Sequence, residues 1–168
     1  MSVFVVDASL VVKGFVPEVH SAAARWWLDA SHDDIAPDLV FPLAGSGIWK
    51  KVGLGELGPE DAQALVNDLA AVGVEVVSMR ALVSDAHELV VRTGITVYDA
   101  TYLALAVRLE TQVVTGDDRF AQKVADYPLL APDVRSVEDF VAERSESGPS
   151  ACRIHSPWPK ISVSVHWA

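Results

Sequence analysis

The sequence predicts an α/β fold, a three-layer α/β/α sandwich with a central, mostly parallel sheet. Three observations support this. Short apolar runs typical of buried strands recur along the chain, helix-like patterns separate them, and the composition of 51% hydrophobic and 21% charged residues is that of a compact globular protein. Strands that alternate with helices are typical of a parallel sheet covered on both faces.

The first part of the chain predicts two strands and three helices. Pro17 stops the first helix, and Gly53 and Gly55 end the third, in which Pro42 interrupts the helical pattern. The predicted strands are 3–6 and 35–36, and the predicted helices are 9–15, 18–30 and 37–52.

The second part continues the alternation. A Gly58-Pro59 pair starts a helix that ends near Gly73. A strand over 74–77, a helix over 81–92, a helix that carries Asp99, a strand over 112–115 and a helix over 118–125 follow.

Residues 1–144 are expected to form one domain, and residues 145–168 an appendage of different composition. The appendage is rich in serine and proline and contains a single acid, Glu146. Its segment 161–165 alternates apolar residues with serine, so the appendage is either a disordered tail or contributes a strand to a sheet edge.

Composition also excludes several classes of protein. The single cysteine, Cys152, forms no internal disulfide, and the five histidines are too scattered for a zinc site. No apolar stretch is long enough for a membrane span, and the N-terminus does not resemble a signal peptide, so we expect a cytoplasmic protein. The net charge of −10 argues against non-specific capture of nucleic acid, although a local basic rim is compatible with it; its candidates are Lys13, Lys50, Lys51, Arg108, Arg119 and Lys123.

Three aspartates lie where strands end or helices begin. Asp7 follows the strand 3–6, Asp117 follows the strand 112–115, and Asp99 opens a helix. The carboxyl ends of parallel strands border one crevice, so these side chains can converge. Clustered carboxylates repel one another unless a cation lies between them, which predicts an oxygen-ligated Mg²⁺ or Mn²⁺.

Each aspartate also has a purely structural interpretation. Asp7 and Asp117 are placed to cap the helices that follow them, and Thr96 and Asp99 have the spacing of a capping box. Ser9 and Thr115 are candidates for orienting a carboxylate or a water molecule through their hydroxyls, or are simple caps. Taken together, the three acids favour the metal site.

Four segments, taken in order, resemble the PIN-domain ribonucleases and, within that family, the VapC-type toxins of toxin–antitoxin pairs. The resemblance covers about residues 1–142, and its carriers are 5–9, 36–39 with 49–50, 96–106, and 114–120. It implies a magnesium- or manganese-dependent endoribonuclease with Asp7, Asp99 and Asp117 as metal ligands. It also implies frequent dimerisation and an antitoxin partner that binds over the active site.

The chain departs from the family pattern at one expected acid. Leu43 stands where PIN domains usually carry a glutamate, and Ser46 stands where an asparagine is common. Asp38 lies too early and Glu56 too late to replace the glutamate on the same helical face. The metal site is therefore expected to hold three carboxylates instead of four.

One alternative to an active nuclease stays open, and a second is disfavoured. The open alternative is a PIN-like binding module that is impaired at Leu43 but retains its partner. A haloacid-dehalogenase-like phosphatase would require a second aspartate two positions after the first, where Ser9 stands.

Overall fold

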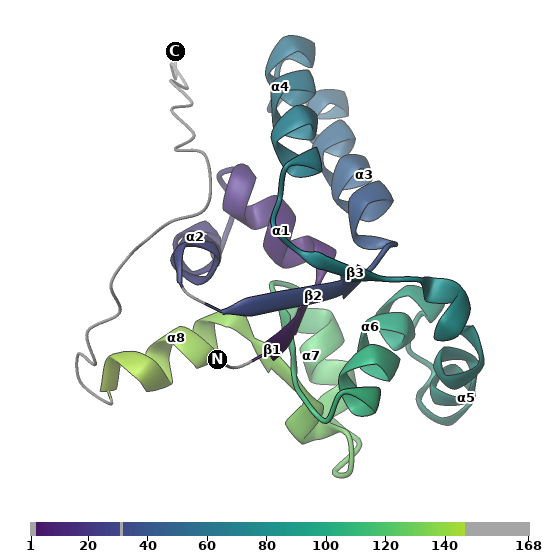
Figure 1. Ribbon diagram of the computed structural model, residues 1–168. Coiled ribbons are helices and arrows are strands. Elements are labelled where there is room, and N and C mark those ends of the chain that lie inside the picture. The colour runs from purple at the N-terminus through teal and green to yellow at the C-terminus, as the bar shows by residue number, and fades with distance from the viewer. Residues whose placement is uncertain (1–2, 31, 147–168) are drawn as a thin grey trace.

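A five-stranded parallel sheet forms the centre of the protein, as the computed structural model shows for residues 3–30 and 32–146 (Figure 1). The strand order is β3-β2-β1-β4-β5, and every neighbouring pair is parallel. The strands are β1 (Val3–Val6), β2 (Asp33–Pro37), β3 (Glu75–Val77), β4 (Val113–Thr115) and β5 (Val134–Ser136). The α/β/α architecture predicted from the sequence is confirmed.

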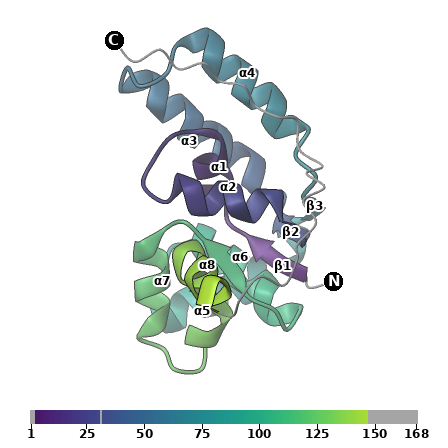
Figure 2. The ribbon, with the colours of Figure 1, turned by 90° about the vertical axis from the view of Figure 1, so that its left-hand side faces the viewer.

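Helices cover both faces of this sheet. Because β-strand crossovers are right-handed, the helices that lead from β1 to β3 lie on one face and those that lead from β3 to β5 on the other. Figure 2 shows the first four helices above the strands and α5 to α7 below them. The helices are α1 (Ala8–Phe15), α2 (Ser21–Asp29), α3 (Val40–Gly53), α4 (Pro59–Ala70), α5 (Val83–Thr93), α6 (Val97–Arg108), α7 (Asp118–Ala125) and α8 (Val137–Glu146), with short 3₁₀ turns at Met79–Ala81 and Ala131–Asp133.

The structure differs from the predicted elements in three places. The sequence did not predict β5 or α8. With only three residues, β5 is too short to show a periodicity. The helix predicted from residue 18 begins at Ser21, since His20 is left-handed with φ 72° and the Ser21 hydroxyl bonds back to the Glu18 carbonyl at 2.6 Å. Pro42 does not interrupt α3, because it is the third helical residue, where the missing N–H has no partner within the helix.

The core is apolar and anchored by aromatic rings. Phe4 of β1 packs edge-on against Trp27 of α2 at a centroid distance of 5.0 Å, and Phe140 of α8 packs against Trp27 at 4.7 Å. These contacts fasten α8 and α2 to the sheet. Helix α6 is buried almost throughout from Ala100 to Ala106, so its first turn is held firmly against the strands.

Candidate active site

The three predicted aspartates lie around the carboxyl ends of the two central strands. Asp7 follows β1 directly and Asp117 lies two residues after β4, and these strands pair through Val6 and Val114. Asp99 lies in the first turn of α6, which packs against β1, β2 and β4. The chain leaves β1 toward one edge of the sheet and β4 toward the other, so this point is the topological switch of the fold, where open α/β sheets bind ligands.

Asp7 is a buried carboxylate and not a helix cap. Its side chain makes no capping bond to α1 and is only 7% exposed. Its Oδ2 instead accepts hydrogen bonds from the Ser9 hydroxyl at 2.5 Å and the Thr115 hydroxyl at 2.7 Å. Burial raises the pKa of Asp7, these two hydroxyls oppose the rise, and the nearby charge of Asp99 adds to it.

Ser9 and Thr115 join the ends of β1 and β4 into one hydrogen-bonded unit. Their hydroxyl oxygens are 3.2 Å apart. The Gly116 N–H donates to the Ser9 hydroxyl at 3.0 Å, and the Asp117 N–H donates to the Thr115 hydroxyl at 2.9 Å. Both residues therefore orient Asp7 and fix the backbone that carries Asp117, which goes beyond a simple capping role.

Asp99 and Asp117 each take part in a hydrogen bond at the start of a helix, and each also carries a carboxylate charge near the site. The Asp99 N–H donates to the Thr96 hydroxyl at 3.1 Å, and Asp117 Oδ1 caps α7 by accepting from the Arg119 N–H at 2.9 Å. Burial raises the pKa of the half-buried Asp99, hydrogen bonding with Thr96 lowers it, and Asp117 raises it again. Asp117 itself is exposed.

The acids form a chain of neighbours rather than a closed cage. Asp7 is influenced by the charge of Asp99, and Asp99 by that of Asp117. Among residues 3–30 and 32–146, no three His, Cys, Asp or Glu side chains come together closely enough to enclose one ion. Mg²⁺ retains several waters and is commonly bound through one or two carboxylates, so a pair drawn from this chain fits a hydrated cation.

Tyr102 is a site residue that the sequence did not reveal. It is 1% exposed, and within the described part of the chain its hydroxyl forms no well-aligned hydrogen bond. Burial raises the pKa of Tyr102, and the charges of Asp7 and Asp99 raise it further, so the hydroxyl stays neutral beside the two acids. The Ala8 backbone N–H is close enough to the hydroxyl to oppose this rise in part. A tyrosine inside an apolar helix looks like a core residue in the sequence, and its position here is set by the packing of α6 on β1.

The start of α3 contributes no carboxylate. Leu43 is half-buried and packs against the core, and the exposed Ser46 donates its hydroxyl to the Pro42 carbonyl at 2.8 Å. Asp38 accepts from the Met79 N–H at 3.1 Å, and Glu56 pairs with Lys51 at 2.6 Å. Neither acid is available as a substitute for the missing glutamate.

Part of the predicted basic rim lies close to the aspartates. The Lys13 side chain packs on Gly116, where an added Cβ would lie 2.7 Å from Lys13 Cδ, and its ammonium is 3.6 Å from the Glu18 carboxylate. The charge of Lys123 lowers the pKa of Asp99, which places this lysine near the site. The Lys13 ammonium also donates to the Val19 carbonyl at 3.1 Å. Lys51 shares Glu18 with Lys13, and Arg108 pairs with Asp85.

Comparison with known proteins agrees with this geometry. The PIN domain family model matches residues 4–125. Ribonuclease VapC3 of Pyrobaculum aerophilum is 31% identical over 128 residues, which cover 75% of this chain and 95% of VapC3. The family model matches most of the chain, and the chain belongs to the PIN domain family.

Two solved structures share the fold at 20% sequence identity. PAE2754 from Pyrobaculum aerophilum has a TM-score of 0.62 and covers 86% of this chain and 96% of its own. Mycobacterium tuberculosis VapC20, a toxin that cleaves the sarcin–ricin loop, has a TM-score of 0.57 and covers 72% of this chain and 94% of its own. Both support the α/β sandwich as the shared framework.

None of the helices in the described residues is both long and apolar enough to cross a membrane.

Proposed function

We propose that this protein is a metal-dependent endoribonuclease, the toxin of a toxin–antitoxin pair, with Asp7, Asp99 and Asp117 as its metal-binding and catalytic acids. The observation that carries the proposal is Asp7: a buried carboxylate, oriented by two hydroxyls and close to a second acid, at the switch point of a PIN domain. A structural cap requires none of these features. Burying an acid beside another acid is costly unless a cation compensates for the charge.

The acids, the hydroxyl residues and Tyr102 each have a separate role in the proposed mechanism. When bound, Mg²⁺ or Mn²⁺ supplies an activated water and stabilises charge on the scissile phosphate. Asp7 and Asp99, the more buried acids, would hold the cation, and the exposed Asp117 would face the incoming substrate. Ser9 and Thr115 hold Asp7 in one orientation, and the neutral Tyr102 hydroxyl, which is buried and within the influence of both acids, would donate a hydrogen bond to one of them.

We assign RNA binding to lysine and arginine side chains near the acids, because the net charge of the whole protein is negative. Lys13 packs on Gly116, the charge of Lys123 acts on Asp99, and Arg119 lies two residues after Asp117 in the chain. Lysine and arginine side chains in such positions neutralise phosphates on either side of the cleaved bond. The protein as a whole carries a net charge of −10, so binding depends on this rim.

The relatives support a proposal for the substrate and the cellular role. VapC3 is a ribonuclease and VapC20 is a toxin that cleaves the sarcin–ricin loop. By extension we propose an RNA substrate and a toxin role for this chain, and from the family resemblance we propose an antitoxin that covers the acids, a homodimer and a cytoplasmic location.

Leu43 favours a second candidate function. Without the α3 carboxylate, the protein would keep its fold and its antitoxin while cleaving RNA weakly or not at all. Leu43 is half-buried against the core, so the start of α3 supplies packing in place of charge.

An RNA cleavage assay with Mg²⁺ or Mn²⁺ separates the two functions. We expect the unmodified chain and Asp118→Asn to cleave structured RNA, and Asp99→Asn to be inactive. Asp118 is a matched control because it is an acid beside Asp117 that pairs with His20 at 3.2 Å. Cleavage that appears only in Leu43→Glu would support the binding module, and cleavage that resists both chelator and Asp99→Asn would refute the metal site.

A further inference from the structure

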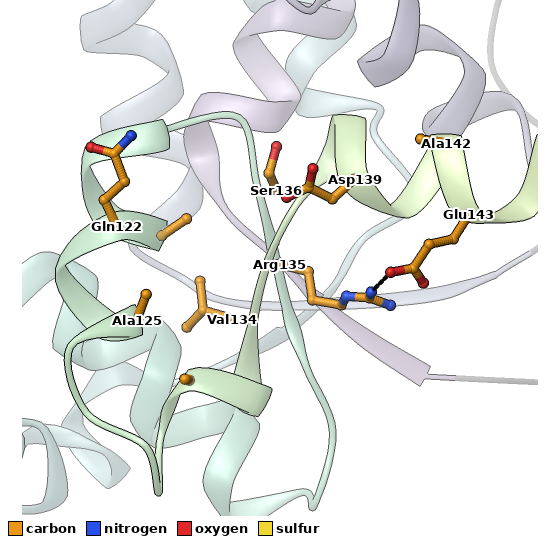
Figure 3. A pocket seen from close by; sticks show the side chains of 10 residues that line it. Gln122, Ala125, Val134, Arg135, Ser136, Asp139, Ala142 and Glu143 are labelled. Atoms are coloured by element: carbon orange, nitrogen blue, oxygen red, sulfur yellow. Dashed lines mark hydrogen bonds and ion pairs between the residues drawn. The ribbon is translucent and has the colours of Figure 1, made fainter.

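A groove of about 500 Å³ lies at the β5 edge of the sheet (Figure 3), and none of Asp7, Asp99 and Asp117 lines it. β5 is the last strand of the sheet, so one side of its backbone has no strand partner among the described residues. An open strand edge presents unpaired N–H and C=O groups to any segment that can extend the sheet. The lining residues come from α7, the 3₁₀ turn before β5, β5 itself and α8.

The groove has two different walls. Consecutive strand residues point to opposite faces, and Figure 3 shows Val134 on the side of Ala125 in α7 and Arg135 on the side of Glu143 in α8. Since α7 and α8 flank opposite faces of β5, a groove lined by both runs across the open edge. The wall on the α7 side is small and mainly apolar, with Ala121 and Ala125 of α7 and Ala131 of the 3₁₀ turn. The wall on the α8 side carries the acid Asp139 and an ion pair between Glu143 and Arg135.

The chain itself contains a segment that matches both walls. Residues 161–165 read Ile-Ser-Val-Ser-Val, so an extended backbone places Ile and Val side chains on one face and serines on the other. The branched side chains suit the alanine wall and the serines suit the acidic wall. No acid follows Glu146, whereas Arg153 and Lys160 add positive charge that complements Asp139.

The connection is long enough for this segment to reach the groove. Helix α8 starts directly after β5 and contains 10 residues, so its end lies about 15 Å from the strand at 1.5 Å per residue. The residues from 147 to 160 can span roughly 45 Å when extended. The segment can therefore turn back and lie beside β5 without strain.

We propose that residues 161–165 dock in this groove as a sixth strand on the free edge of β5, in the same molecule. The docked strand adds main-chain hydrogen bonds to β5, and its alternating side chains set the register. It also covers an edge that would otherwise be open to pairing between molecules. The sequence left open whether residues 145–168 contribute an edge strand, and these residues lie almost wholly outside the described part of the chain. The proposal specifies β5 as the edge to which that strand would bind.

Hydrogen exchange of the full chain, read by mass spectrometry, tests the docking. We expect the amides of residues 162–165 to exchange at least about tenfold more slowly than those of an unpaired chain. Val163→Lys should abolish this protection, because it places a charge against the alanine wall. Ser164→Lys carries the same added charge but faces the acids, so it should retain the protection.

A second pair of variants tests the groove from the other side. Ala125→Arg fills the apolar wall and should abolish protection of residues 162–165. Ala64→Arg, on the exposed surface of α4, should leave it intact. Rapid exchange of 162–165 in the unmodified chain, or equal loss in Val163→Lys and Ser164→Lys, would overturn the proposal. Protection that grows with protein concentration would also overturn it, because the segment would then be docking on a second copy.

Discussion

The sheet carries a buried aspartate, Asp7, at one end and a partly buried aspartate, Asp34, at the other, and the comparison shows what distinguishes a candidate active site from an isolated acid. At the carboxyl end, Asp7 accepts two hydroxyl hydrogen bonds and is close to Asp99. Toward the amino end, Asp34 of β2 accepts a single bond, from Trp27 Nε1 at 3.2 Å. Burial, the main cause in both places, raises the pKa of each acid, to about 6 for Asp34.

The main difference lies in the neighbouring acids. The charge that raises the pKa of Asp34 further is that of the exposed acid Asp33, and it is a smaller cause than burial. Asp7 belongs to a run of acids at the topological switch point, together with the buried Tyr102 hydroxyl. A raised carboxylate pKa alone therefore does not define a site, whereas a shared environment of acids and orienting hydroxyls does.

The largest expected effect is on RNA cleavage in Asp7→Asn. This change keeps the shape of the side chain but removes the charge that binds the cation, so we expect a loss of about 100-fold or more. Asp34→Asn makes the same chemical change at the other end of the sheet and should leave cleavage unchanged. Equal activity of Asp7→Asn and Asp34→Asn in a fluorogenic RNA assay would contradict the assignment of catalysis to the Asp7 end of the sheet.

The next effect concerns the stability of Asp34→Asn as a function of pH. The folded pKa of Asp34 is raised from 3.8 to about 6, so the fold favours the neutral acid, and stability falls as the pH rises from 3.8 through 6. The loss above this window is about 3 kcal/mol at most. The asparagine variant should match the unmodified chain near pH 4 and be more stable at pH 7.

Urea denaturation at both pH values measures this difference. Asp33→Asn is the control, because Asp33 is exposed and only adds a repulsion to Asp34. A stabilisation of Asp34→Asn that is independent of pH would show that ionisation of this acid is not its cause.

A smaller effect is expected at the start of α3. Leu43→Glu adds a carboxylate where the chain has none, so the Mn²⁺ concentration needed for half-maximal cleavage should fall by roughly tenfold. Because Leu43 is half-buried against the core, we also expect a loss of stability of about 1–2 kcal/mol. Leu43→Gln controls for the packing change, and an equal effect of Gln and Glu on the Mn²⁺ requirement would contradict the charge argument.

The smallest effect is expected at Gly116. An added Cβ would lie 2.7 Å from Lys13 Cδ and 2.9 Å from Lys13 Cε, so Gly116→Ala must move a flexible side chain away from the acids. We expect less than about 1 kcal/mol of destabilisation and a several-fold weaker binding of RNA. Gly53→Ala, where nothing lies within 4 Å of the added atom, should change neither quantity.

The sequence predicted the sheet and most of its helices, because these depend on local periodicity, and the rule that parallel strands end at one edge placed Asp7 and Asp117 after neighbouring strands. It did not predict β5 or α8. The strand has only three residues, and the helix is held by contacts of Phe140 with Trp27 that come from distant parts of the chain.

The roles of the individual acids were less predictable than their positions. Asp7 and Asp117 look alike in the sequence, since each follows an apolar strand. In the structure Asp7 is buried and bonded to Ser9 and Thr115, whereas Asp117 is exposed and caps α7. The difference arises from residues that only the folded chain brings together, and the same holds for the Tyr102 hydroxyl.

The most direct test of the cation site is a Mn²⁺ titration of thermal stability in the unmodified chain, Asp7→Asn and Asp34→Asn. A ligand that binds only the folded state stabilises it by about 2.7 kcal/mol at one hundred times its dissociation constant. We predict that Mn²⁺ raises the melting temperature of the unmodified chain and of Asp34→Asn, but not that of Asp7→Asn. An equal rise in all three proteins, or no rise in any, would contradict the assignment of the metal site to the Asp7 end of the sheet.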